Sequence, residues 1–276
     1  MKIQLLYYSG AGNTKFIANS IEEALSRKNY DVNTIKISEK SINSLNNDFD
    51  ILILGSPVYF RETPELVNKI FDKISGENRP IMVFLTKGLY SGNTYKNIHK
   101  KSIENNFIPI GLMEIFMPGT DLLTLAIKEK SSLENFAISI HSKKINKKID
   151  TFIGKIGKNK PIKNVLPKWY TFFDELIVKK AEIKADNSHK DWIGKFTVNV
   201  DNCIYCKKCI NGCPHGNIEL NEKIAFGINC DVCFYCINNC QKYAIYLSET
   251  RRNNVRYSEE KINKIFSGIL EKQTSV

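Results

Sequence analysis

Long apolar runs are missing from this sequence. No stretch approaches the roughly 18 apolar residues that a membrane-spanning helix needs, so we expect no transmembrane segment. The N-terminus, Met1-Lys2 followed by a short apolar run to Tyr8, has neither the length nor the small-residue cleavage site of a secretory signal. The eight cysteines are also too few over 276 residues for a disulfide scaffold. These absences favour a cytoplasmic protein.

Arginine is scarce as well. Only six of the 40 basic residues are Arg, although the net charge is +11. Arginine makes the bidentate contacts that phosphates and bases favour, and the positive charge is spread along the chain instead of forming one stripe. We therefore expect no nucleic-acid partner.

Hydrolase motifs are absent too. No serine or cysteine nucleophile elbow occurs, and His99, His141, His189 and His215 have no recognisable nucleophile or metal partner in the sequence. The composition, 42% hydrophobic and 25% charged, is typical of a globular chain with one large domain or two ordinary ones.

Short apolar runs alternate with helix-period segments over residues 1–156. Strands are expected at Ile3–Tyr8, Val32–Ile37, Ile51–Leu54 and Ile81–Leu85, with a fifth inside Phe107–Met117. Strands that alternate with helices form parallel βαβ units, and nearly solid apolar strands are covered on both faces. The pattern predicts a doubly wound α/β domain with a five-stranded parallel sheet.

Helix start signals accompany this pattern. Thr63 is expected as the N-cap of one helix, with Pro64 at the first helical position. A second helix is expected at Thr94–Glu104. Ser131 and Glu134 have the spacing of a capping box, which predicts one long helix that closes the domain.

Two segments flank the cysteine-rich part of the chain. Residues 157–195 are predicted to be a linker with one helix, which packs the domains together or else meets a membrane surface or a partner. The apolar side of that helix carries Trp169, Phe172, Phe173, Leu176 and Ile177. Residues 251–276 are predicted to form a C-terminal amphipathic helix, with Tyr257 and Ile262 as a hydrophobic staple around Ser258.

All eight cysteines fall within residues 196–250, as two copies of C-x2-C-x2-C-x3-C. The first copy comprises Cys203, Cys206, Cys209 and Cys213, and the second, 27 residues later, comprises Cys230, Cys233, Cys236 and Cys240. A structural zinc site takes four ligands, usually from two separated C-x2-C pairs, and would leave the middle thiolates without a metal. Three cysteines at spacing three suit three corners of a 4Fe–4S cubane, with the fourth reaching another cluster.

This pattern resembles the bacterial-type ferredoxin, a small α+β domain with two 4Fe–4S clusters. The resemblance implies that Cys203, Cys206, Cys209 and Cys240 hold one cluster, and that Cys230, Cys233, Cys236 and Cys213 hold the other. Pro214 agrees with the family pattern, whereas Gln241 stands where a second proline is usual. The clusters would replace a large apolar core. The residues expected to shield the sulfurs are Ile204, Ile210, Ile218, Ile237 and Ile245.

The first predicted strand runs directly into a glycine-rich loop. The loop comprises Ser9, Gly10, Ala11, Gly12, Asn13 and Thr14, and a helix follows it. Glycines let backbone N–H groups close on an anion, and the helix N-terminus favours negative charge. The loop has neither the Gly-Lys-Ser/Thr ending of a triphosphate loop nor the spacing of a dinucleotide loop, so a monophosphate fits best.

This loop resembles the FMN phosphate loop of flavodoxins, and two later loops agree in order and position. One contains Ser56, Pro57, Val58, Tyr59 and Phe60; the other contains Thr86, Lys87, Gly88, Tyr90, Ser91, Gly92 and Asn93. The resemblance implies bound FMN, with Tyr59 and Tyr90 stacking beside the flavin and the backbone near Gly88 at its pyrimidine edge. Ala11 replaces a usual Thr or Ser, which removes a hydrogen bond of about 1.5–3 kcal/mol to the phosphate and predicts weaker binding.

The whole chain resembles the flavodoxin–ferredoxin fusion proteins. That resemblance implies electron transfer between two 4Fe–4S clusters and FMN, with a soluble redox protein as partner. The alternative is an FMN-dependent oxidoreductase that reduces a quinone or another small molecule with electrons delivered through the clusters. A zinc-bound nucleic-acid module is a third alternative, and it predicts zinc in place of iron. The direction of electron flow and the oligomeric state, monomer or homodimer, stay open.

Overall fold

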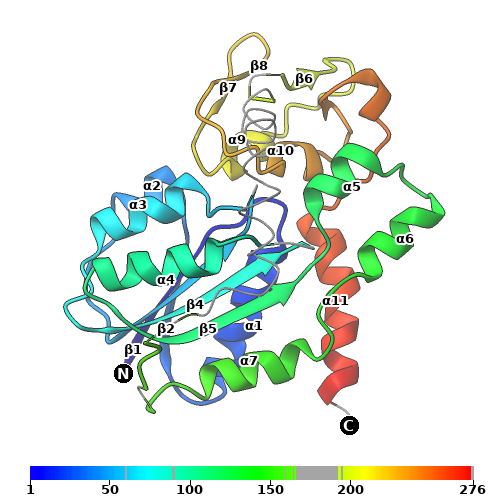
Figure 1. Cartoon of the computed structure of the whole chain (residues 1–276). Helices are drawn as coiled ribbons and strands as arrows, with labels where there is room; N and C mark the ends of the chain where they lie inside the picture. Colours follow the sequence, from blue (N-terminus) through cyan, green and yellow to red (C-terminus); the bar gives the residue numbers. More distant parts are fainter. Residues whose placement is uncertain are drawn as a thin grey trace, which may run out of the picture.

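A parallel sheet forms the centre of the first domain. The computed structural model describes residues 1–59, 61–88, 91–158, 160–163, 165, 192–193 and 195–274. The strands lie in the order β2-β1-β3-β4-β5 (Figure 1). Their bounds are β1 Lys2–Tyr7, β2 Asp31–Lys36, β3 Ile51–Pro57, β4 Pro80–Lys87 and β5 Ile108–Phe116. The predicted five-stranded parallel sheet is therefore confirmed.

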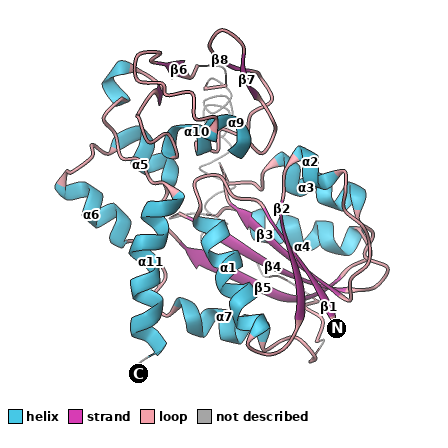
Figure 2. Ribbon diagram, turned by 180° about the vertical axis from the view of Figure 1, so that it is seen from behind, coloured by secondary structure: helices cyan, strands magenta, loops and turns pink. Residues whose placement is uncertain are grey.

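Helices cover both faces of this sheet (Figures 1 and 2). One face packs on α1 (Asn13–Ser26), α7 (Ile145–Ile153) and α11 (Glu259–Thr274). The other face packs on α3 (Glu65–Lys73) and α4 (Thr94–Glu104). Neighbouring residues of β1 show why a solid apolar strand is needed: Leu5 belongs to the first core and Leu6 to the second, and both are fully buried.

The start of α3 differs by one position from the sequence prediction. Pro64 is the N-cap itself, not the first helical residue. The hydroxyl of Thr63 donates to Asn68 Oδ1 at 3.2 Å, so Thr63 still supports the first turn from outside the helix. Helix α4, in contrast, has the expected bounds. A short helix, α2 (Glu39–Ile42), had no counterpart in the prediction.

The single long helix expected after Ser131 is wrong. The chain forms α6 (Ser132–Ser139) and then α7, and no side-chain capping bond joins Ser131 to the helix that contains Glu134. Between the helices, the N–H of Ser142 donates to the carbonyl oxygen of Phe116 at 2.7 Å. The hydroxyl of Ser142 accepts from the N–H of Phe116, also at 2.7 Å. Pairing with the end of β5 therefore interrupts the helix.

Residues 196–250 form a small α+β unit beyond the carboxyl ends of the sheet strands (Figure 1). Strand β6 (Thr197–Val198) pairs antiparallel with β9 (Ile245–Tyr246), and β7 (Ile218–Leu220) pairs antiparallel with β8 (Ile224–Phe226). Each cysteine copy contributes a short helix, α9 (Lys208–Gly212) or α10 (Tyr235–Asn238). We call residues 196–250 the cysteine-rich unit.

The apolar residues of the cysteine-rich unit are only partly where they were expected. Ile218, Ile237 and Ile245 are buried in one apolar cluster, and Ile210 packs against it. Ile204 is 57% exposed, yet it lines a small cavity together with Cys203, Cys206, Cys209 and Cys240, so its role in shielding sulfur stays a prediction.

The C-terminal segment returns from the cysteine-rich unit to the first domain. A 3-10 turn, η1 (Glu249–Arg251), leads to α11, where the hydroxyl of Ser258 accepts from the N–H of Lys261 at 3.2 Å. The Phe266 ring lies 5.5 Å from that of Phe16 on α1. The helix predicted around residues 169–177 lies outside the described residues. Among those described, no helix is long and apolar enough to cross a membrane.

Candidate functional site

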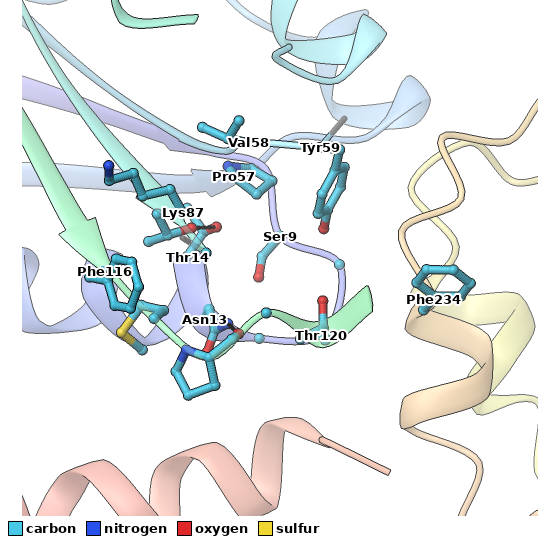
Figure 3. A pocket seen from close by; sticks show the side chains of 18 of the residues that line it. Ser9, Asn13, Thr14, Pro57, Val58, Tyr59, Lys87, Phe116, Thr120 and Phe234 are labelled. Carbon is cyan, nitrogen blue, oxygen red and sulfur yellow. Dashed lines mark hydrogen bonds between the residues drawn. The ribbon is translucent and has the colours of Figure 1, made fainter. Parts of the chain in front are cut away.

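A cavity of about 390 Å³ lies at the carboxyl ends of β1, β3 and β4 (Figure 3). Open α/β sheets bind their ligands at this edge. All three loops predicted from the sequence contribute to its lining. The predicted residues that line it are Ser9, Gly10, Ala11, Gly12, Asn13, Thr14, Pro57, Val58, Tyr59, Thr86, Lys87 and Gly88. The fold therefore brings loops distant in sequence to one cavity.

The first loop has the features of an anion site. Within the described part of the chain, the N–H groups from Gly10 to Thr14 donate to no acceptor. Helix α1 begins at Asn13 and has no acidic side chain in its own first turn, and Glu259 of α11, which lies beside Gly12, pairs with Lys15 at 2.7 Å. The hydroxyls of Thr14 and Thr86 share a hydrogen bond of 2.7 Å, which joins the first and third loops. This row of N–H donors fits a phosphate group.

Aromatic and cationic side chains surround the rest of the cavity. Tyr59 approaches it from the loop after β3, Phe116 from the end of β5 and Phe234 from the cysteine-rich unit (Figure 3). Flat rings of this kind suit a planar heterocycle. Lys87 and Arg61 bring positive charge, and the ammonium of Lys87 lies 3.9 Å from a carboxylate oxygen of Glu114.

Some residues predicted for this site have other positions. Those that do not line the cavity are Ser56, Ser91, Gly92 and Asn93. Ser56 is fully buried and its hydroxyl donates to the carbonyl oxygen of Pro57 at 2.7 Å. Ser91 is also fully buried and donates to Glu114 at 2.8 Å. These two hydroxyls hold the loops inside the fold. Phe60 and Tyr90 lie outside the described residues.

Arg61, Ala137 and Ile140 line the cavity but were not predicted, and two longer parts of the lining were missed as well. One is the loop Phe116–Thr120, which leads from β5 into α5 (Thr120–Ala126); its Pro118 carbonyl oxygen accepts from Asn13 Nδ2 at 2.9 Å. Its position after the fifth parallel strand was the available signal. The other part is Val232 and Phe234 of the second cysteine copy. No local pattern shows that this copy folds over the cavity.

The eight thiols separate into two sets. Cys203, Cys206, Cys209 and Cys240, the outer set, surround a small apolar cavity. Cys213, Cys230, Cys233 and Cys236, the inner set, interact with one another. The fourth cysteine of each copy thus lies with the first three of the other copy. Among the described residues, no three His, Cys, Asp or Glu side chains lie close enough to bind a single metal ion.

The two sets differ in exposure. Cys206 is exposed, whereas Cys233 and Cys236 are buried. Burial raises the pKa of Cys230 to about 11 and the pKa of Cys233 to about 12. These thiols are therefore protonated at neutral pH without a metal, and ligation would release their protons.

Backbone N–H groups already point to thiols of both sets. The N–H of Val232 donates to Cys230 Sγ at 3.3 Å, and that of Ala244 donates to Cys240 Sγ at 3.3 Å. The N–H of Asn217 donates to Cys213 Sγ at 3.4 Å. Such donors orient metal-bound thiolates and stabilise their charge. The donor set, four thiols with N–H support, fits an iron–sulfur cluster.

Buried polar contacts fix the cysteine-rich unit to the first domain. The N–H of Glu39 donates to the carbonyl oxygen of Pro214 at 2.9 Å. The Oδ1 atom of Asn238 accepts from the N–H of Tyr257 at 2.7 Å and from the hydroxyl of Thr124 at 3.1 Å. Asn238 is 2% exposed, so both bonds are shielded from water. The position of the unit over the cavity is therefore specified by directional bonds as well as by packing.

Comparison with known proteins identifies the first domain. The family model described as "Flavodoxin domain" matches residues 4–137. A flavodoxin from Clostridium beijerinckii is 31% identical over 105 residues, which cover 36% of this chain and 74% of that protein. A flavodoxin from Megasphaera elsdenii is 30% identical over 63 residues, 23% of this chain and 45% of that protein.

Solved structures share this similarity. The solution structure of two-electron reduced Megasphaera elsdenii flavodoxin is 23% identical, with a TM-score of 0.35, over 41% of this chain and 84% of that one. The family match ends at residue 137, so the cysteine-rich unit lies beyond it.

Proposed function

The chain belongs to the flavodoxin family, and from this premise we propose that it is an electron-transfer protein with FMN in the cavity and 4Fe–4S clusters at the two cysteine sets. One observation carries the proposal. Val232 and Phe234, which flank Cys233 of the inner set, line the same cavity as the phosphate-type loop. A cofactor in the cavity and a cluster on the inner set would therefore share one wall.

The cavity residues have separate tasks in this proposal. The N–H groups of the loop from Gly10 to Thr14 hold the phosphate of FMN, and Tyr59 and Phe116 contact the flavin rings. Ala11 is 3% exposed and offers a methyl group where a hydroxyl would donate, so the phosphate depends on the backbone donors. FMN supplies exchange of one or two electrons, and each 4Fe–4S cluster supplies exchange of one.

The outer set provides the face for a partner. Around the exposed Cys206, Ile204 is 57% exposed and Tyr205 is 41% exposed, and Lys207 and Lys208 are exposed beside them. A small apolar surface with a basic rim suits a soluble redox protein that has an acidic surface. In the inner set, Cys233 and Cys236 are buried, and Cys233 lies in the core of the first domain.

The test is a cofactor analysis of protein purified without oxygen. We expect about eight irons, as many sulfides and one FMN per chain. The matched variants C206S and C233S each remove one thiol, from the outer and the inner set respectively, and each is expected to lose about half of the iron. Zinc in place of iron would refute the cluster proposal. Eight irons without FMN, and no uptake of added FMN, would refute the flavin proposal.

The same protein distinguishes electron transfer from small-molecule reduction. The chemically reduced protein is mixed with a quinone in excess, and the number of quinones reduced per FMN is counted with a continuous supply of electrons. Sustained turnover at rates above those of free FMN would favour an oxidoreductase. Quinone reduction no faster than with free FMN would favour an electron carrier.

A further inference from the structure

The cysteine-rich unit contacts the phosphate-type loop at Cys233. Cys233 is buried within the apolar core of the first domain, on the sheet face that also contains Tyr8. A Cβ placed on Gly10 would lie 2.6 Å from the carbonyl oxygen of Cys233 and 2.8 Å from its Cβ. The phosphate-type loop and the inner set are thus in direct contact, with no room for a side chain between them.

Tyr8 belongs to the same apolar core as Cys233. It follows β1 directly, is fully buried, and its ring meets the ring of Tyr59 edge to face, with centroids 6.2 Å apart. Its hydroxyl is buried and has no hydrogen-bond partner, sulfur included, within the described part of the chain. Cys233 is buried in the same apolar cluster, and after burial its thiol is the main influence that raises the pKa of this hydroxyl. A buried phenol hydroxyl needs a partner, because leaving a buried donor unsatisfied costs about 1–3 kcal/mol.

Resting on the proposed function, we propose that Tyr8 is a positioning residue whose hydroxyl donates a hydrogen bond to the Sγ atom of Cys233, and so sets the reduction potential at the inner set. A donor to a cluster sulfur stabilises the more negative, reduced state. Tyr8 therefore makes the inner set easier to reduce. The same ring packs on Tyr59, so one side chain links the cysteine set to the wall of the cavity.

The internal repeat supplies a natural contrast. Cys206 holds the position in the first copy that Cys233 holds in the second. Cys206 is exposed and is not part of the core that contains Tyr8, and among the described residues no hydrogen bond from a phenol reaches it. The two sets have similar sequences but would therefore differ in the hydrogen-bond donors to their sulfur atoms. The less exposed set, beside the cavity, has the additional donor.

The test compares two variants that each remove one buried phenol hydroxyl. Y8F removes the donor to Cys233 and keeps the ring. Y257F is the matched control, since Tyr257 is also fully buried with an unsatisfied hydroxyl, but the structure gives that hydroxyl no contact with a cysteine. Midpoint potentials of both clusters are measured by EPR-monitored titration of the anaerobic proteins, after iron and FMN have been quantified.

We expect Y8F to retain the iron content of the unaltered protein and to lower the potential of one cluster only. Loss of a hydrogen bond to a charged sulfur shifts the one-electron equilibrium by about tenfold, or about 59 mV. Y257F should leave both potentials unchanged. Equal potentials in Y8F and the unaltered protein, or equal shifts at both clusters, would overturn the proposal.

A second measurement tests the proposal if the Y8F protein does not fold. Incorporation of 3-fluorotyrosine at position 8 alone keeps the shape of the side chain and strengthens the phenol as a donor. The same cluster potential should then rise, and an unchanged potential would overturn the role of Tyr8. Absence of iron from the unaltered protein would instead overturn the proposed function, and this inference with it.

Discussion

Substitution of Gly10 by alanine tests the contact between the two domains most directly. Gly10 does not have a positive φ, so an alanine is compatible with its backbone. Its added Cβ would nevertheless lie 2.6 Å from the carbonyl oxygen of Cys233 and would overlap the hydroxyl of Tyr59. Carbon atoms prefer about 3.5–4.0 Å. The backbone oxygen cannot rotate away, so the cysteine-rich unit or the loop must move.

The expected cost follows from this geometry. Overpacking of a tight contact destabilises by about 1–3 kcal/mol. For a chain of this size each kcal/mol lowers the melting temperature by about 2–4 °C. Displacement of the unit also moves Val232 and Phe234, which line the cavity. We therefore expect G10A to unfold at lower temperature and to bind FMN more weakly.

Gly88 provides the control within the same cavity. Among the described residues, a Cβ at Gly88 would have only the Cα of Gly119 within 4 Å, at 3.8 Å, and Gly88 does not have a positive φ either. G88A should change stability by about 0.5 kcal/mol or less. The assays are thermal unfolding by circular dichroism and titration with FMN by quenching of its fluorescence. Equal melting temperatures for G10A and G88A, or an FMN affinity of G10A equal to that of the unaltered protein, would refute the proposed contact.

Three further predictions concern the attachment of the cysteine-rich unit. N238A removes the acceptor of the Tyr257 N–H, and urea unfolding should show a loss of about 1–3 kcal/mol, whereas an unchanged midpoint would contradict the bonding described. F266A leaves a void against Phe16 and should cost about 3–5 kcal/mol; a smaller loss would mean that α11 is not firmly packed. Removal of iron with an anaerobic chelator should make residues 196–250 sensitive to protease while residues 1–156 stay protected, since metal binding contributes to folding; uniform protection would contradict this.

Local sequence patterns predicted the elements of the first domain well. Helix α4 has the expected bounds, and each strand lies within a few residues of its predicted place. Strands that are buried on both faces of a doubly wound sheet have nearly continuous apolar sequences, which makes them easy to find. The helix after Ser131 failed for a tertiary reason. Ser142 exchanges two hydrogen bonds with Phe116, a residue of β5, and no pattern near Ser142 announces that partner.

The candidate site was predictable to a similar degree. Glycine and hydroxyl residues marked the first loop because anion binding has local requirements, and the structure places that loop at the cavity. The partner of His215 was not visible in the sequence. Its Nε2 atom lies 2.7 Å from an Asp231 carboxylate oxygen, and the two residues come from different cysteine copies. Ligation by the cysteines stays a prediction until iron is measured.

The return of the C-terminal segment explains how a second domain can form a permanent wall of the cavity. After the cysteine-rich unit, the N–H of Val255 donates to the carbonyl oxygen of Ile127 at 2.9 Å, and α11 then packs on α1. The unit is thus bonded to the first domain beside α5 and held again by a helix on the sheet. Tethering of this kind replaces a concentration-dependent encounter by an intramolecular one. Phe234 therefore reaches the cavity from within the same chain, and the inner set lies beside the cavity without a separate binding step.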